Sequence, residues 1–314
     1  MAKKKGNILT EGDKIGITAP ASPSSLALVK EAEAELKGFG FQVEIGDSCY
    51  INDGGYLAGS AVLRAKEIQA MFANPSIKAI ICLRGGYGSP QILNEIDYEF
   101  ITFHPKLFIG YSDITAIHIA LQQKSQLVTI HGPMATSEIA NGLDAFSQAS
   151  FLRMLTNPIP LGTVINPKEE PIKCLVPGKA DGDLIGGNLS LIANLLGTPY
   201  EIDTKGKILF LEEIEEEPYK IDRMLTQLSL SGKFDDASAL VLGSWTNCHS
   251  QSYPRGLQVE DLFEKIIAPF KKPTIYNVQA GHCRPTLTLP LGVRATVDAT
   301  NKQLIIEESV VKGN

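Results

Sequence analysis

The sequence predicts an α/β protein of two lobes, with a doubly wound parallel sheet in the N-terminal lobe and a mixed α/β domain in the C-terminal lobe. Short apolar runs alternate with segments of helical periodicity, which is the pattern of βαβ units. The length of 314 residues exceeds the usual size of one domain. A proline-rich stretch without periodicity separates the two halves.

The N-terminal lobe, residues 1–156, shows the alternation most clearly. Its apolar runs are strand-sized and typical of parallel strands buried on both faces. Between them, apolar residues recur at helical spacing, as Leu28, Ala32 and Leu36 do. We therefore expect helices on both faces of this sheet. Strands are predicted at residues 14–19, 41–45, 78–83, 106–110 and 128–131, and helices at 26–38, 60–72 and 114–122.

The second half of the chain begins with residues 157–182, which hold five prolines and no helical period. This stretch is expected to form a linker or crossover. The C-terminal lobe, residues 183–314, again mixes both patterns and is expected to be α/β. Strands are predicted at 207–212, 239–243 and 274–278, helices at 189–196, 219–230 and 259–270, and a hairpin at 294–308.

The bulk composition excludes several classes of protein. A net charge of −6 and a pI near 5.5 argue against a nucleic-acid partner, which requires a basic surface. No apolar run is long enough for a membrane span, and the N-terminus lacks the apolar core of a signal peptide. The five cysteines form no CxxC pair and no HExxH occurs, so neither a disulfide framework nor a metal site is expected. These features predict a protein of the reducing cytoplasm that needs no cofactor.

Ser112 lies where a predicted strand ends at Gly110 and a helix begins near Asp113. In open α/β sheets, ligands gather at the carboxyl ends of strands. A serine at such a turn can point its hydroxyl out of the sheet as a nucleophile, and the backbone amide of Asp113 is then placed to bind an oxyanion. The alternative is that Ser112 caps the helix, since serine is a favoured N-cap residue. The segment lacks the GxSxG form, so its spacing leaves both interpretations open.

A glycine-rich turn follows the strand predicted at 78–83. Gly85 and Gly86 allow the backbone to approach a ligand closely, so that its amides can face an oxyanion or a phosphate. The segment is neither a Walker loop nor a dinucleotide-binding fingerprint. A tight strand-to-helix connection without a ligand is the alternative.

Glu212 and two histidines complete the set of candidates. Glu212 ends the apolar strand predicted at 207–212 and is expected at the ligand edge of its sheet. His131 ends a predicted strand and His282 follows one, and these two are the candidates for a general base. A serine peptidase needs a hydroxyl, a carboxylate and a histidine, and Ser112, Glu212 and His282 supply these groups in that order.

Short motifs along nearly the whole chain resemble those of the LD-carboxypeptidases, a serine peptidase family that also contains the microcin C self-immunity peptidases. They occur in the order found in the family, which makes the set more specific than any single motif. They are GDKIG at 12–16, RGGYGS at 84–89, GYSDIT at 110–115, HGPM at 131–134, GGNL at 186–189, LEE at 211–213, IDR at 221–223 and GH at 281–282.

The resemblance implies a two-lobed α/β fold with a Ser-Glu-His triad. It assigns the nucleophile to Ser112, the acid to Glu212 and the base to His282. Glu212 is a better match than Glu213, because the acid of the family follows its strand directly. The resemblance also implies a homodimer that works without a metal ion.

The same resemblance implies how the substrate is held. The oxyanion hole would be formed by the backbone amides of Asp113 and Gly86, and Gly85 and Arg84 are expected to contact the substrate. The typical substrate of the family is a muropeptide tetrapeptide, cleaved between the L-centre of a diamino acid and the terminal D-Ala during cytoplasmic recycling of cell-wall fragments. The RGGYG form at 84–88 favours this branch of the family.

Two alternative functions remain. The first is an immunity-type amidase of the microcin C class that cleaves peptidyl or aminoacyl nucleotides. The second is a non-catalytic α/β protein whose glycine turn binds a small anion. The sequence also leaves open whether the third residue of a tetrapeptide substrate is lysine or diaminopimelate.

Overall fold

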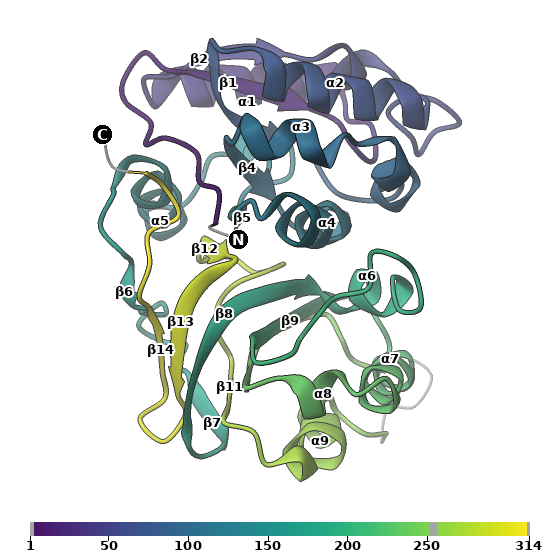
Figure 1. Cartoon of the computed structure of the whole chain (residues 1–314), viewed down its shortest axis with the longest axis vertical. Coiled ribbons are helices and arrows are strands. Elements are labelled where there is room, and N and C mark those ends of the chain that lie inside the picture. The colour runs from purple at the N-terminus through teal and green to yellow at the C-terminus, as the bar shows by residue number, and fades with distance from the viewer. Residues whose placement is uncertain (1–2, 251–255, 313–314) are drawn as a thin grey trace. The chain divides into compact units, whose positions relative to one another are not determined.

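The computed structural model describes residues 3–250 and 256–312, and the chain divides into two units (Figure 1). Unit 1 consists of residues 1–158, 288–292 and 310–314. Unit 2 consists of residues 159–287 and 293–309. Two segments near the C-terminus therefore belong to the same unit as the N-terminal half of the chain.

Unit 1 is built on a six-stranded sheet with the order β12-β5-β4-β3-β1-β2. All neighbours pair in parallel except β12, which pairs antiparallel with β5 at one edge. The order of the parallel strands is that of a doubly wound sheet whose switch point lies between β1 and β3. The strands are β1 Lys14–Thr18, β2 Gln42–Ile45, β3 Ile77–Cys82, β4 Leu107–Gly110, β5 Thr129–His131 and β12 Leu289–Leu291.

The helices of unit 1 follow from apolar periodicity and, except for α4, from side-chain caps at their N-termini. In α1 the buried residues Val29, Ala32 and Leu36 share one face, and Ser25 caps the helix by accepting a hydrogen bond from the amide of Leu28. Right-handed crossovers place α1 on one face of the sheet and α2 and α4 on the other. The helices are α1 Leu26–Gly38, α2 Ala61–Ala73, α3 Tyr98–Phe103, α4 Thr115–Ser125 and α5 Ala145–Thr156, with 3₁₀ turns at Asp47–Tyr50, Ser89–Glu95, Ser112–Ile114 and Ile139–Asn141.

Unit 2 contains an eight-stranded mixed sheet with the order β6-β14-β13-β8-β9-β10-β11-β7. The central strands β8, β9, β10 and β11 are parallel, and the flanking strands pair antiparallel. The strands are β6 Gly162–Thr163, β7 Lys173–Val176, β8 Lys179–Asn188, β9 Ile208–Ile214, β10 Ala239–Thr246, β11 Thr274–Tyr276, β13 Val293–Asp298 and β14 Gln303–Ile306. The helices are α6 Leu189–Asn194, α7 Pro218–Leu230, α8 Lys233–Asp236 and α9 Val259–Leu262.

The predicted α/β class, with a doubly wound N-terminal sheet and a mixed C-terminal domain, is confirmed. Several elements differ from the prediction. Residues 157–182 contain β6, β7 and the start of β8, because these short segments pair with strands far away in sequence. Strand β9 runs past Glu212 to Ile214. The helix expected at 259–270 is broken into α9, a π-turn at Phe263–Ile267 and a 3₁₀ turn that contains Pro269, whose missing N–H cannot continue an α-helix.

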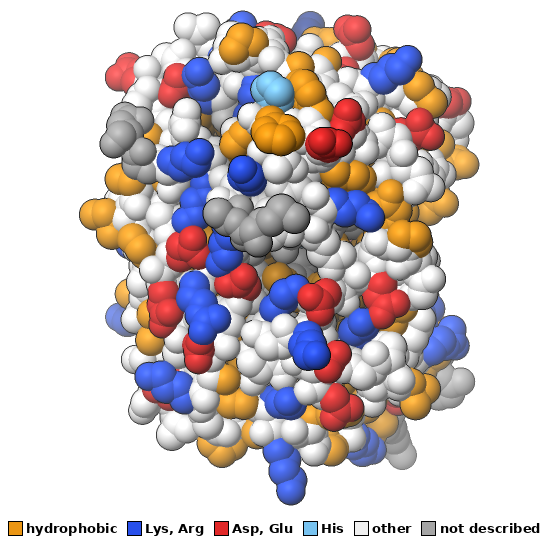
Figure 2. Space-filling model, viewed as in Figure 1, with side chains coloured by type: hydrophobic (Ala, Val, Ile, Leu, Met, Phe, Trp, Pro, Cys, Tyr) orange, Lys and Arg blue, Asp and Glu red, His pale blue; other side chains and the backbone are white. Residues whose placement is uncertain are grey.

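The described part of the chain has no helix that is long and apolar enough to cross a bilayer. Lysine and arginine side chains are interspersed with acidic ones on the face drawn in Figure 2. Among the described residues on that face, no extended surface of one charge is visible, in keeping with the net charge of −6.

Candidate active site

In unit 1, Ser112 lies two residues after Gly110, the last residue of β4, and has a φ of 63°. This left-handed conformation is uncommon for a residue with a side chain. The short turn Ser112–Ile114 starts here, and Ile114 rather than Ser112 is the N-cap of α4, with no side-chain cap. Ser112 is half-buried. A serine in a strained backbone conformation between a strand and a helix, which does not itself cap the helix, has the geometry of a nucleophile elbow.

The glycine turn lies directly against this serine. A Cβ atom on Gly85 would stand 3.0 Å from the hydroxyl oxygen of Ser112 and 3.2 Å from the backbone nitrogen of Asp113. Gly86 has a φ of 102°, and a Cβ there would collide with the side chain of Ser22. Glycine at position 85 lets the turn approach the hydroxyl and the amide of Asp113 this closely, and glycine at position 86 lets it adopt a positive φ against Ser22.

Ser22, in the loop after β1, holds the glycine turn in place and was not among the predicted residues. Its backbone amide donates to the carbonyl of Gly85 at 3.3 Å, and its hydroxyl accepts from the amide of Tyr87 at 3.0 Å. The hydroxyl also donates to the carbonyl of Tyr56 at 2.8 Å. Ser22 thus joins the loops after β1 and β3, at the switch point of the sheet. No local pattern marks it, because its partners are remote in sequence.

Arg64 is a second residue that sequence reasoning missed. Its side chain is fully buried on α2 and donates to the backbone carbonyls of Gly59 at 3.0 Å, Gly88 at 2.9 Å and Pro20. Burial lowers the pKa of the Arg64 guanidinium, and the charge of Asp113 opposes this shift. Arg64 therefore stabilises the two loops that flank the glycine turn from inside the protein.

The carboxylate of Asp113 is buried and accepts a hydrogen bond from the amide of Ser89 at 2.8 Å. The hydroxyl of Ser89 donates to the backbone carbonyl of Asp113. Burial raises the pKa of the Asp113 carboxyl, while the hydrogen bonds from Ser89 act to lower it. These bonds fix the backbone of Asp113, whose amide is the predicted oxyanion donor, relative to the end of the glycine turn.

In unit 2, His282 and Glu212 form a hydrogen-bonded pair. The Nδ1–H group of His282 donates to Oε2 of Glu212 at 2.7 Å, and the backbone amide of His282 points to the same oxygen at 3.3 Å. The Glu212 side chain is fully buried, and that of His282 is 12% exposed. A carboxylate that accepts from Nδ1 fixes the tautomer in which Nε2 carries no hydrogen and can take up a proton.

Gly281 allows the segment that carries His282 to approach the carboxylate of Glu212. It has a φ of 114°, and a Cβ atom there would lie 2.5 Å from Oε2 of Glu212 and 2.8 Å from the hydroxyl of Ser244. The hydroxyl of Thr246 donates to the backbone carbonyl of His282 from the adjacent strand β10. The imidazole is thus held by its neighbours in the sheet as well as by Glu212.

The neighbouring Glu213 points to a different set of partners. Its carboxylate accepts from the side-chain amide of Asn188 at 2.8 Å and from the amide and hydroxyl of Ser190 at 2.8 and 2.6 Å. Burial raises the pKa of Glu213, and the hydrogen bond from Ser190 acts to lower it. Successive residues of a strand face opposite sides, so Glu213 ties β9 to the start of α6 while Glu212 meets the histidine.

His131, the other candidate base, is 1% exposed at the end of β5, and its ring packs against Tyr111 at a centroid distance of 5.4 Å. Of the two candidates, His282 is the one whose Nδ1 is hydrogen-bonded to a carboxylate, that of Glu212. Within the ranges 3–250 and 256–312, no group of three or more His, Cys, Asp or Glu side chains is placed to hold a metal ion.

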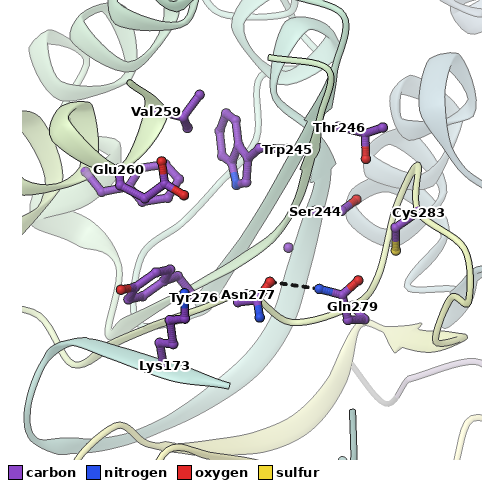
Figure 3. Close-up of a pocket in the computed structure, with 12 residues that line it drawn as sticks. Lys173, Ser244, Trp245, Thr246, Val259, Glu260, Tyr276, Asn277, Gln279 and Cys283 are labelled. Atoms are coloured by element: carbon purple, nitrogen blue, oxygen red, sulfur yellow. Dashed lines mark hydrogen bonds between the residues drawn. The ribbon is translucent and has the colours of Figure 1, made fainter. Parts of the chain in front are cut away.

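A cavity of about 210 Å³ lies in unit 2 beside the segment that carries His282 (Figure 3). Its walls include the aromatic rings of Trp245, Phe263 and Tyr276. Cys283, the residue after His282, also lines it, and burial raises the pKa of the Cys283 thiol. The thiol therefore stays protonated at neutral pH and is a poor nucleophile.

The predicted site residues therefore fall into two sets, each with its own geometry. Unit 2 brings together Glu212 and His282. Unit 1 brings together the hydroxyl, the predicted oxyanion donors and the predicted substrate contacts, which are Ser112, Asp113, Gly86, Gly85 and Arg84.

Comparison with known proteins matches both halves of the chain to one family. The N-terminal domain of the LD-carboxypeptidases matches residues 15–132, and their C-terminal domain matches residues 181–297. A probable murein peptide carboxypeptidase of Bacillus subtilis is 40% identical over 314 residues, covering 98% of this chain and 96% of that protein.

Two solved structures show the same architecture. The microcin C7 self-immunity protein MccF superposes with a TM-score of 0.91 at 26% identity, covering 98% of this chain and 99% of the other. The muramoyltetrapeptide carboxypeptidase of Oxalobacter formigenes superposes with a TM-score of 0.81 at 31% identity, covering 93% and 97%. The chain therefore belongs to the LD-carboxypeptidase family of serine peptidases.

Proposed function

We propose that this protein is a carboxypeptidase that hydrolyses the bond between the L-centre of a diamino acid and the terminal D-Ala of cell-wall tetrapeptides. The named activities of its relatives support this substrate class, since one is a probable murein peptide carboxypeptidase and another a muramoyltetrapeptide carboxypeptidase. The observation that carries the proposal is the hydrogen bond of 2.7 Å between Glu212 and His282. It prepares an imidazole to act as a general base.

In the proposed mechanism, the hydroxyl of Ser112 attacks the carbonyl carbon of the scissile amide. Nε2 of His282 takes the hydroxyl proton, and Glu212 stabilises the imidazolium that forms. The negative charge on the carbonyl oxygen is bound by the backbone amides of Asp113 and Gly86. His282 then gives its proton to the nitrogen of D-Ala, which leaves. Water attacks the acyl-enzyme by the same route and releases the tripeptide.

A nucleotide conjugate is the second candidate substrate. The superposition on MccF with a TM-score of 0.91 favours it, because one MccF structure contains glutamyl sulfamoyl guanosine. The same hydroxyl, base and oxyanion donors would cleave either amide. The two candidates differ only in what leaves, D-Ala in one case and a nucleotide derivative in the other.

The two candidates are separated by measuring both reactions with purified protein. We expect D-Ala release from tetrapeptides with lysine or diaminopimelate at the third position, and slower turnover of an aminoacyl sulfamoyl adenosine. Ser112→Ala should melt at the wild-type temperature and lose about 10⁴-fold or more in kcat. Faster turnover of the conjugate would favour the second candidate. Near-wild-type D-Ala release by Ser112→Ala would refute the serine mechanism.

We further propose, from the family resemblance, that the enzyme works in the cytoplasm as a homodimer without a metal ion. All five cysteines carry free thiols, which suits a reducing compartment. Sedimentation equilibrium should give twice the 34.0 kDa mass of one chain. A single species with the mass of one chain at micromolar concentration would contradict the dimer.

A further inference from the structure

If the proposed function holds, the enzyme must recognise a free carboxylate close to the bond that it cleaves. The carboxylate carbon of a terminal D-Ala is three bonds from the attacked carbonyl carbon, a distance of at most about 3.7 Å. A cation that binds this carboxylate must therefore stand within a few ångströms of the nucleophile. Such a contact would restrict cleavage to the last residue of the peptide.

Arg84 places a cation in this region of unit 1. It is the residue before Gly85, whose missing Cβ leaves room for the hydroxyl of Ser112 at 3.0 Å. A guanidinium nitrogen of Arg84 lies 3.9 Å from the point that a Cβ on Gly86 would occupy. The hydroxyl and the guanidinium thus lie against successive residues of one turn, whose Cα atoms are about 3.8 Å apart.

The side chain of Arg84 is exposed, and none of the described residues forms a hydrogen bond or an ion pair with its guanidinium. Arg64, a second arginine near this turn, is buried, and its guanidinium already donates to backbone carbonyls and to the side chain of Gln91. The carboxylate of Asp113 is likewise buried and bonded to Ser89. Arg84 can therefore bind a carboxylate by two parallel charge-assisted hydrogen bonds.

The backbone on either side of Arg84 is also fixed. Strand β3 ends two residues earlier, at Cys82, and Ser22 forms hydrogen bonds with the following residues Gly85 and Tyr87 at 3.3 and 3.0 Å. A binding group on a rigid turn costs less conformational entropy to use than one on a mobile loop.

We propose that Arg84 forms a carboxylate-binding subsite that holds the free carboxylate of the departing D-amino acid. This subsite makes the enzyme a carboxypeptidase, because a peptide that continues past D-Ala has an uncharged amide at that position. It also disfavours leaving groups that carry no carboxylate there.

The test uses two tetrapeptides that differ only at the C-terminus, one ending in D-Ala and the other in D-alaninamide. Wild-type enzyme should prefer the acid by about 10- to 100-fold in kcat/KM, the range expected for hydrogen bonds to a charged group. Arg84→Gln should lose this preference because its kcat/KM for the acid falls, mainly through a higher KM. Its kcat/KM for the amide should equal that of wild type. Arg84→Lys should retain part of the preference, because it keeps the charge but loses the planar fork.

Arg153→Gln, at an exposed position of α5, is the matched control and should keep the wild-type preference. An unchanged ratio of acid to amide in Arg84→Gln, with D-Ala release intact, would overturn the subsite and leave the proposed function standing. Equal loss on both peptides would also overturn it, since that result indicates general damage to the turn. A wild-type enzyme that releases no D-Ala from the acid would overturn the proposed function and this inference with it.

Discussion

Ser112 has a backbone conformation that costs on the order of 1–3 kcal/mol for a residue with a side chain. Surrounding groups that have no catalytic role of their own offset this cost. Ser22 holds the glycine turn, Arg64 holds the loops on either side of it, and Ser89 holds the backbone of Asp113. Strain supported in this way keeps the hydroxyl in one orientation before a substrate binds.

Gly85→Ala tests whether the close approach of the turn matters for catalysis. The added methyl group would stand 2.9 Å from Cβ and 3.0 Å from Oγ of Ser112, so it must displace the hydroxyl. We expect kcat/KM for D-Ala release to fall by about 100-fold or more, the effect of a misplacement of about 1 Å. Gly38→Ala at the end of α1, where nothing lies within 4 Å, is the control and should be as active as wild type. Similar activity in both variants would count against the geometry proposed for the turn.

Glu212→Gln tests the role of the carboxylate that faces His282. An amide in place of the carboxylate no longer stabilises the imidazolium and can favour the wrong tautomer. We expect kcat to fall by about 10⁴-fold, as measured by D-Ala release under saturating substrate. Glu213→Gln is the matched neighbour, because Glu213 bonds to Asn188 and Ser190, and it should lose less than about tenfold. Equal losses in the two variants would contradict the assignment of Glu212.

At the scale of elements, α4 is joined to β4, the strand that precedes the proposed nucleophile Ser112. His118 is fully buried on α4, and its Nε2–H donates to the carbonyl of Gly110, the last residue of β4, at 2.8 Å. Burial lowers the pKa of His118 to about 4, and the hydrogen bond to Gly110 opposes this shift. His118 is therefore neutral in the folded protein at neutral pH and packs edge-on against Phe108.

The lowered pKa predicts a pH-dependent stability. The unfolded chain binds a proton on His118 below its ordinary pKa of 6.5, whereas the folded chain does so only near 4. The contribution of neutral His118 to the free energy of unfolding is thus complete above pH 6.5. It is lost as the pH falls from 6.5 towards 4, and the loss amounts to up to about 3 kcal/mol. Urea unfolding of His118→Gln, which keeps a donor for Gly110, should show a weaker loss of stability between pH 7 and 4.5 than wild type. Identical pH profiles would contradict this account.

The elements themselves were largely predictable from the sequence. Helix α1 matches the predicted range 26–38, because its caps and apolar periodicity are local. The short strands β6 and β7 were not predicted, since Thr163 pairs with Ile305 and Cys174 with Ile275, and only the folded chain brings these partners together. Prolines near both strands also suggested an irregular segment. In these two segments, strand formation depends on pairing in the folded chain and not on the local sequence preference.

At the scale of the whole molecule, the sequence could place candidate groups at strand ends but could not show their contacts. The positions of Ser112, Glu212 and His282 at or soon after predicted strands, together with the family motifs, are visible in the sequence alone, although β9 continues past Glu212 to Ile214. Hydrogen bonds such as that between Glu212 and His282 join residues that are 70 positions apart, and no local pattern encodes them. For the same reason the supporting residues Ser22 and Arg64 were missed.

The proposed mechanism depends above all on activation of the hydroxyl of Ser112 by the pair that His282 and Glu212 form. The most direct measurement is the rate at which a fluorophosphonate modifies the protein, with the modified residue identified by peptide mass spectrometry. We predict that the label lies on Ser112 and that His282→Ala slows the labelling by about 100-fold or more, as the loss of a general base requires. Labelling of another residue, or an unchanged rate in His282→Ala, would contradict the account.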